Sequence, residues 1–288
     1  MLVVGGYFGT PGTELNANAR DPNPTNTVLS GEIGTPGFGD NIITIVSGPS
    51  GLPFLTNDAL LDGFTITGAD RHAIDLGGNN SPTLSNLNIV GNGDASALLS
   101  TDFAGAGLTM IGGSRPIIES CTFTANVASA GGAVDIPGGR PLFNNCRFEA
   151  NAAFGPPVGL FLAGGGAVRI GSGEAALDPA LGISVPTTFR NCAFEQNDSF
   201  GGSGGAILKT GTLHLVNCAF TGNTAAGAGH DGNGGAVASS GSAFRMHDCD
   251  FTANAVTNVF IDPAHAIVGG SAWYSDKEVV EAVCCRFF

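Results

Sequence analysis

The sequence predicts an all-β fold: a right-handed parallel β-helix solenoid of about eight stacked coils. A six-residue motif recurs along the chain, and a glycine-rich block precedes most of its copies. The composition agrees, because 43% of the residues are hydrophobic, only 12% are charged and 46 are glycine. Such a chain can fill a core, but it lacks the many Lys, Glu and Arg residues that cover exposed helices. These observations favour short strands joined by turns.

The recurring motif is C-x-F-x-x-N, where x is any residue. Each full copy has an apolar residue three positions before the cysteine and a small polar residue directly before it. Neighbouring motif cysteines are 25 or 26 residues apart at the closest, so one repeat unit is about this long. Full copies begin at Cys121, Cys146, Cys192, Cys218 and Cys249, degenerate copies at Phe64 and Leu87, and a truncated copy at Cys285.

The glycine-rich block, G-G-A-[VI], lies about fifteen residues before most copies of the motif. It occupies residues 131–134, 165–168, 204–207 and 234–237. A unit of this length with several short strands and no helical periodicity is typical of one coil of a solenoid. Larger gaps, such as 46 residues between Cys146 and Cys192, indicate the same unit with inserted loops.

Within the motif, Cys and Phe alternate with a period of two, so both side chains are expected to point inward from a short strand. The polar residue before the cysteine and the Asn after the strand mark turns, because Asn tolerates left-handed backbone. Stacking of coils at roughly 4.8 Å would align equivalent side chains. We therefore expect an amide ladder, a stack of rings and a row of buried thiols that pack as small hydrophobes instead of forming disulfides. The expected columns are Asn126, Asn151, Asn197, Asn223 and Asn254; Phe123, Phe148, Phe194, Phe220 and Phe251; and Cys121, Cys146, Cys192, Cys218 and Cys249.

The repeats divide the chain into three parts. Residues 1–50 are a leading segment with the first coil, residues 51–257 are β-helix repeats, and residues 258–288 are irregular with a truncated last repeat. Loop insertions are expected near 152–164 and 171–186. Because the last motif stops at Cys285-Arg286-Phe287 and a solenoid needs covered ends, we expect an uncapped fragment of a longer protein. Its open coil ends would allow oligomerisation.

The alternating G-G-A-[VI] and F-x-x-N blocks resemble the repeats of bacterial polymorphic outer-membrane proteins, and of the wider right-handed parallel β-helix (pectin-lyase-like) superfamily. The resemblance covers roughly residues 5–255, and it implies a secreted or cell-surface bacterial protein. The motifs specify the fold but not an activity, because the superfamily includes lyases, hydrolases, esterases and non-enzymatic adhesins. The start, MLVVGGYFGTPG, lacks the features of a signal peptide, so any export signal is expected outside this chain.

The net charge of the chain disfavours some classes of binding partner. The formal net charge of −13 disfavours nucleic acid and anionic membranes, both of which need clustered Lys and Arg. No apolar run is long enough for a transmembrane segment. An acidic, Lys-poor chain suits the outside of a cell or divalent cations, so Ca²⁺ is compatible with it, although no cofactor is required. The expected partners are carbohydrate or a host or neighbouring cell surface.

One constellation is a candidate for chemistry. Glu149 and Glu195 follow the motif Phe in consecutive coils, and Arg147 projects from the same face. Two carboxylates about one coil spacing apart can hold Ca²⁺ or act as a catalytic pair. The alternative is a solvated stripe of charged residues, with Arg147 balancing the two glutamates. None of the five histidines lies in a nucleophile motif.

Three functions remain open from the sequence. The first is a non-enzymatic surface module, adhesin-like or facing carbohydrate, which the regular repeat and the lack of a catalytic signature favour. The second is a polysaccharide lyase or glycoside hydrolase that acts on an acidic polysaccharide. The third is a purely structural repeat of a large exported protein.

Overall fold

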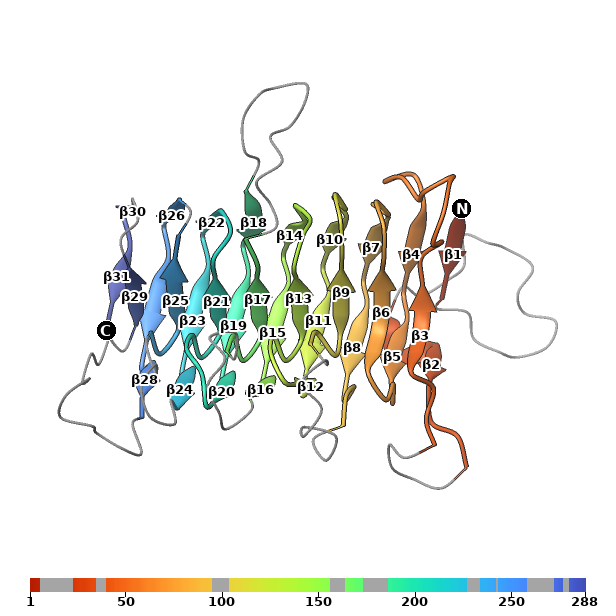
Figure 1. The fold of residues 1–288 in the computed structure, drawn as a ribbon, viewed down its shortest axis with the longest axis horizontal. Coiled ribbons are helices and arrows are strands. Elements are labelled where there is room, and N and C mark those ends of the chain that lie inside the picture. The colour runs from red at the N-terminus through yellow and green to blue at the C-terminus, as the bar shows by residue number, and fades with distance from the viewer. Residues whose placement is uncertain are drawn as a thin grey trace.

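The computed structural model describes residues 1–5, 23–34, 40–94, 104–155, 164–172, 186–226, 234–241, 243–257, 272–276 and 280–288. These residues form four parallel β-sheets whose strands stack along one axis from the N-terminus to the C-terminus (Figure 1). Every strand pairs with the equivalent strand of the neighbouring coil, not with its neighbour in sequence. The predicted right-handed β-helix is therefore confirmed.

Two of the sheets contain nine strands each and run the length of the molecule. Sheet 1 consists of β1 (Leu2–Val4), β4 (Leu60–Asp62), β7 (Thr83–Ser85), β10 (Ile117–Glu119), β14 (Leu142–Asn144), β18 (Thr187–Arg190), β22 (Leu213–Val216), β26 (Phe244–His247) and β30 (Val280–Val283). Sheet 2 consists of β2 (Val28–Ser30), β5 (Thr65–Thr67), β8 (Asn88–Val90), β11 (Thr122–Thr124), β15 (Arg147–Glu149), β19 (Ala193–Glu195), β23 (Ala219–Thr221), β27 (Asp250–Thr252) and β31 (Arg286–Phe287).

The other two sheets are shorter. Sheet 3 consists of β12 (Val127–Ala128), β16 (Ala152–Phe154), β20 (Asp198–Phe200), β24 (Thr224–Ala226) and β28 (Ala255–Val256). Sheet 4 consists of β3 (Thr44–Ser47), β6 (His72–Leu76), β9 (Leu108–Met110), β13 (Val134–Ile136), β17 (Val168–Ile170), β21 (Ile207–Lys209), β25 (Val237–Ser240) and β29 (Trp273–Asp276). A 3₁₀ turn, η1 (Pro24–Asn26), precedes β2.

The described strands make eight coils that reach sheet 4, and β30 and β31 begin a ninth. The paired strands extend to both sides of residues 51–257: β1 to β3 lie before this range, and β29 to β31 lie within 258–288. The expected insertions fall largely on residues 156–163 and 173–185, which lie outside the described residues. Among the described residues no helix is long and apolar enough to cross a membrane.

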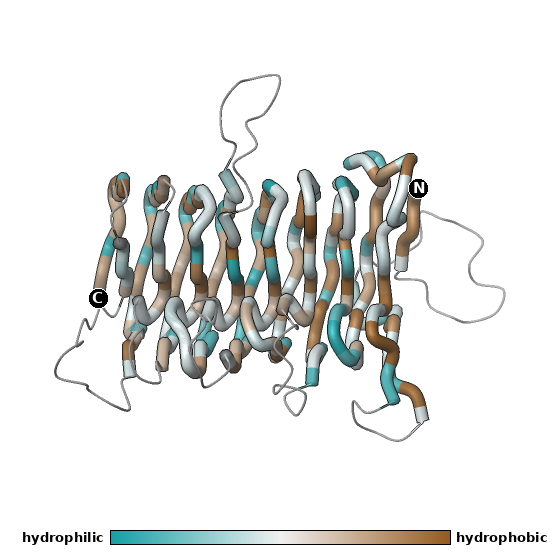
Figure 2. The backbone as a smooth tube through the Cα atoms, viewed as in Figure 1, coloured by the Kyte–Doolittle hydropathy of each residue, from teal (hydrophilic) through white to brown (hydrophobic). Residues whose placement is uncertain are grey.

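The core lies between the sheets and consists of inward columns of apolar side chains. Hydrophobic residues recur in each coil as the chain passes through the sheets (Figure 2). Phe123 and Phe148 of sheet 2 are fully buried and stack at 4.9 Å between ring centroids. A second column on sheet 1 stacks Phe143 on Phe189 at 4.6 Å. Phe123, Phe148 and Phe194 of sheet 2 meet sheet 1 rings edge-on, as Phe148 meets Phe143 at 5.7 Å, so the two columns interlock in these coils.

Two single-residue bends join the sheets at positive φ. The bend from sheet 1 to sheet 2 is the small polar residue before the motif cysteine, such as Asn145 at φ 55°. The bend from sheet 2 to sheet 3 lies one residue before the motif Asn, at Ala125, Ala150 and their equivalents. The sequence had suggested that the Asn after the strand adopts the left-handed conformation, and this prediction is wrong, because the residue before it does. The Asn side chain is committed to hydrogen bonds inside the core instead.

The G-G-A-[VI] block is explained by close backbone approach. Its first glycine is left-handed, as at Gly131 with φ 54°. Its second glycine faces backbone on two sides: a Cβ at Gly132 would collide with the carbonyl oxygens of Gly166 and Ala152. A side chain at either position would push the coils apart, so the repeat needs both glycines.

The motif cysteines form a column of free, buried thiols. The Cys146 thiol donates to the carbonyl oxygens of Asn144 at 3.4 Å and of Ile118 in the preceding coil at 3.5 Å. Burial raises the pKa of Cys146. A hydrogen bond with Cys192 raises the pKa of Cys218 to about 12. These thiols therefore remain protonated in the folded protein at pH 8, where a free cysteine would be partly ionised.

We expect this burial to make most of the thiols unreactive. In native protein at pH 8, a disulfide reagent such as DTNB should quickly modify Cys284, which is exposed, and more slowly Cys285. All seven cysteines should react after denaturation. Rapid modification of more than two thiols in the folded protein would contradict the buried column.

Candidate charged site on sheet 2

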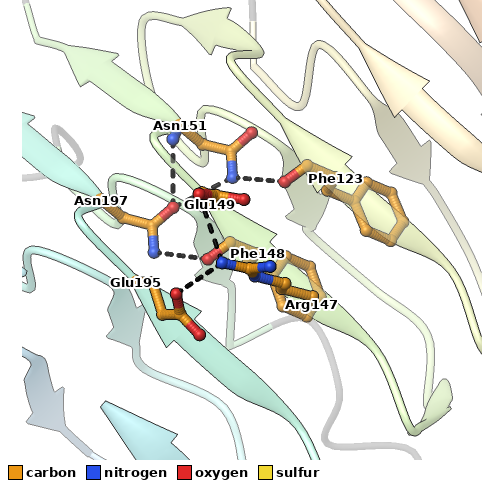
Figure 3. A network of polar contacts seen from close by, with 7 residues as sticks. All are labelled: Phe123, Arg147, Phe148, Glu149, Asn151, Glu195 and Asn197. Carbon is orange, nitrogen blue, oxygen red and sulfur yellow. Dashed lines mark hydrogen bonds and ion pairs between the residues drawn. The ribbon is translucent and has the colours of Figure 1, made fainter. Parts of the chain in front are cut away.

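Strands β15 and β19 bring the three candidate residues together on the outer face of sheet 2. The strands pair in parallel, with Glu149 opposite Glu195 and Arg147 opposite Ala193. Phe148 and Phe194 point into the core between these positions, so the charged side chains point away from it. The close view shows Arg147 lying between the two carboxylates (Figure 3).

Arg147 bridges both glutamates. Its Nη2 atom lies 2.7 Å from Glu195 Oε2 in the next coil and 3.3 Å from Glu149 Oε1 on the same strand. The three side chains are partly exposed, at 47% for Arg147, 34% for Glu149 and 35% for Glu195. Because water screens such a network, it contributes about 1 kcal/mol or less to stability. The cluster carries one net negative charge.

This arrangement limits the chemistry available to the carboxylates. Ca²⁺ takes six to eight oxygen ligands, and the two carboxylates here face a guanidinium instead of a shared cation position. Within the described ranges no group of three or more His, Cys, Asp or Glu side chains is placed to hold a metal ion. The geometry fits hydrogen bonding to a neutral or weakly charged ligand, because the guanidinium and the carboxylates offer donors and acceptors side by side.

The rest of the sheet 2 outer face is largely polar, with Val28, Val90, Ala193 and Ala219 as apolar exceptions. Thr124, Thr221 and Thr252 continue the column that contains the two glutamates. At the C-terminal end Arg286 pairs with Asp250 through two contacts of 2.6 and 2.5 Å, and this pairing lowers the pKa of Asp250. The face therefore presents hydroxyl groups and paired charges in rows.

An amide ladder lies beneath the site, inside the bend between sheets 2 and 3. Asn151 Nδ2 donates to Asn197 Oδ1 at 3.0 Å and to the Phe123 carbonyl oxygen at 2.9 Å (Figure 3). The same pattern joins each member to the next. Members of the ladder are Asn92, Asn126, Asn151, Asn197, Asn223 and Asn254.

Three polar features were not singled out from the sequence. Asn92 joins the ladder through Asn126 at 3.0 Å, and the degenerate copy that begins at Leu87 was the signal for it. Arg169 makes a two-pronged ion pair with the buried Asp135 at 2.6 and 2.8 Å on sheet 4, at positions that follow the glycine-rich block. Finally, sheet 1 carries a group of Arg and His side chains on consecutive coils, which no repeat motif marks.

Comparison with known proteins identifies the fold but not an activity. A family model described as the right handed beta helix region matches residues 43–228. Neither a curated protein nor a solved structure matches the chain. The matched range includes the charged site and most of the ladder.

Proposed function

Because the chain belongs to the right-handed beta helix family, whose fold serves both enzymes and binding proteins, we propose that it is a non-enzymatic module that presents the outer face of sheet 2 to carbohydrate. A location outside the cell, in a secreted or surface protein, is part of the proposal. The main support is the pairing of Arg147 with both Glu149 and Glu195. The two carboxylates best placed for catalysis are therefore already engaged by a guanidinium.

The scaffold supports a binding role. Nine strands in register hold the rows of Thr, Glu and Arg side chains at fixed spacing. Side chains on a rigid surface lose little further freedom when a ligand binds, which favours affinity. A polysaccharide also repeats at regular intervals, so it can meet equivalent groups on successive coils.

The alternative with an observation in its favour is a polysaccharide lyase or hydrolase. Glu149 and Glu195 lie on neighbouring strands, and retaining glycosidases hold their two carboxyl groups about 5.5 Å apart. Arg147 lies within contact distance of both. For catalysis, however, a substrate would have to displace Arg147 from at least one carboxylate.

We expect the variant Glu149→Gln with Glu195→Gln to lose binding to polysaccharide at least tenfold while its unfolding midpoint changes little, because these side chains are partly exposed. The protein would be screened against acidic and neutral polysaccharides, with Ca²⁺ and with chelator, for binding and for new reducing ends or unsaturated products. Glu32→Gln with Asp58→Asn is the matched control, because it removes two exposed carboxylates from the first two coils, whose strands do not pair with β15 or β19.

The outcomes separate the functions. Binding without product, lost in the double variant and kept in the control, supports the module. Product release that disappears in the double variant would establish the enzyme instead. If no polysaccharide binds, the carbohydrate proposal is wrong, and the purely structural repeat becomes the better account.

A further inference from the structure

Sheet 1 carries a cluster of basic side chains on three consecutive coils. Arg190 ends β18, His214 lies on β22, and Arg245 and His247 lie on β26. Register pairs His214 with Arg245, and it places Arg190 and His247 in one outward column on either side of Val216. All four alternate with buried residues of the core, such as Phe189 and Leu215, so they share the outer face.

This cluster contrasts with the rest of the molecule. The chain has only 11 Lys and Arg residues and a net charge of −13. In an earlier coil the same outward column of sheet 1 contains the exposed Glu119, whereas Asp62, further toward the N-terminus, is buried and accepts a hydrogen bond from Asn86. The basic side chains of this face therefore gather on β18, β22 and β26. Such a local concentration of positive charge on an acidic protein marks a place where an anion is attracted more strongly than elsewhere.

The acidic groups nearby do not cancel the cluster. Within the described part of the chain Arg190 has no ion-pair partner. Arg245 Nε lies 3.2 Å from Glu281 Oε2 of β30, but both side chains are more than half exposed, at 68% and 59%. His247 Nδ1 lies 2.7 Å from Asp248 Oδ2 at the following bend. One guanidinium is thus unpaired, and the other is held only by an exposed contact that a ligand can displace.

His214 lies at the centre of this group. Burial first, and then the positive charges of Arg190, Arg245 and His247, lower the pKa of His214, while Glu281 opposes the effect. The protonated form of His214 is therefore disfavoured by its basic neighbours. An anion placed among them would offset this effect and raise the pKa of His214.

We propose that Arg190, His214, Arg245 and His247 form a binding surface for an oxyanion, with sulfate as the ligand chemistry, either free or carried as esters on a polymer. Guanidinium groups bind tetrahedral oxyanions through paired N–H donors, and protonated histidine adds a donor and a charge. The surface lies on sheet 1 and does not depend on the function proposed for sheet 2.

The proposal predicts that binding strengthens as pH falls from 8 to 5.5. Histidine is the side chain that gains charge in this interval. Protonation of His214 beside the bound anion should tighten binding on the order of fivefold. Glu281 and Asp248 are the acidic groups that face the cluster, and they limit this gain.

The test measures retention of the full chain on dextran sulfate and on unmodified dextran at pH 5.5 and 8. The double variant Arg190→Gln with Arg245→Gln is compared with the double variant Arg71→Gln with Arg115→Gln. The second variant removes the same charge from exposed arginines elsewhere. Inorganic sulfate serves as competitor, and the pKa of His214 is followed by NMR with and without it. The Gln variant also tests the local electrostatics, because it should raise the pKa of His214.

We expect retention on dextran sulfate but not on dextran, competition by inorganic sulfate, and at least a tenfold loss in the sheet 1 variant alone. A rise of the His214 pKa with inorganic sulfate, without retention on the polymer, would support the site and identify free oxyanion as the source. Equal losses in the two arginine variants, or no response to sulfate in either measurement, would overturn the proposal. Binding of a neutral polysaccharide by sheet 2 is a separate readout that needs no sulfate, so this test and that of sheet 2 fail independently.

Discussion

Replacement of Asn151 by alanine is expected to lower the free energy of unfolding by roughly 4 kcal/mol. Asn151 is fully buried in the middle of the amide ladder. Its Oδ1 atom accepts from the backbone N–H and the side-chain amide of Asn126, both at 3.0 Å. Its Nδ2 atom donates to Asn197 and to the Phe123 carbonyl. Alanine would leave these groups without partners in a dry core, and each costs about 1–3 kcal/mol.

The measurement is the midpoint of urea unfolding, with Asn144→Ala as the control. Asn144 ends β14 on the outer face of sheet 1, where its amide donates to Glu119 at 3.2 Å in contact with solvent. Its loss should cost less than about 1 kcal/mol, because water replaces the partner. A similar small effect at Asn151 would mean that the ladder does not stabilise the coils.

Phe148→Ala is expected to cost about 3–5 kcal/mol, because truncation of a buried ring leaves a cavity that the stacked coils cannot close. The Phe148 ring stacks on Phe123 at 4.9 Å and on Phe194 at 4.7 Å. Its edge contacts meet Phe143 at 5.7 Å and Phe189 at 5.9 Å. All four neighbours belong to the same interlocked columns, so the gap would reach three consecutive coils.

Phe200→Ala is the matched control for this prediction. The Phe200 ring also stacks on a phenylalanine, Phe154 at 4.6 Å, but it is 42% exposed on sheet 3. Its removal should cost about 1 kcal/mol, mainly from the lost stacking. Equal destabilisation by the two variants in thermal and urea unfolding would contradict the distinction between interior and surface stacks.

The repeat made the main architecture predictable because one motif corresponds to one coil. The inward direction of Cys and Phe follows from a two-residue period, and the confirmed fold pairs each motif with the next. The conformation of the bends between sheets was harder to predict from the sequence. Ala125 and Ala150 adopt φ 52° and 51°, although alanine carries no sequence signal for left-handed backbone. The surrounding ladder and strand pairings fix the conformation there.

The candidate site could be predicted from the sequence only in part. Alternation indicates that Arg147, Glu149 and Glu195 share a face, but not which carboxylate the guanidinium contacts. That depends on side-chain rotamers, and the structure shows contact with both. The sheet 1 cluster was not predicted, because its outward positions carry a different residue type in each coil and no repeated basic motif marks them. His214 and Arg245 lie four residues before their motif cysteines, and strand register brings them beside Arg190.

The amide ladder also gives the molecule a polarity. Every side-chain amide donates in the same direction, from Asn92 toward Asn254, so the amide dipoles are parallel and add along the axis. At one end the Asn92 oxygen accepts from the Ala69 backbone N–H, whereas at the other the Asn254 amide donates to Phe220 and to no other residue that the structure describes. The two ends are therefore chemically different: at the Asn92 end the amide oxygen accepts a hydrogen bond from the backbone, and at the Asn254 end the side-chain amide has a further N–H to donate. Any segment that continues the row beyond Asn254 must therefore bring an acceptor.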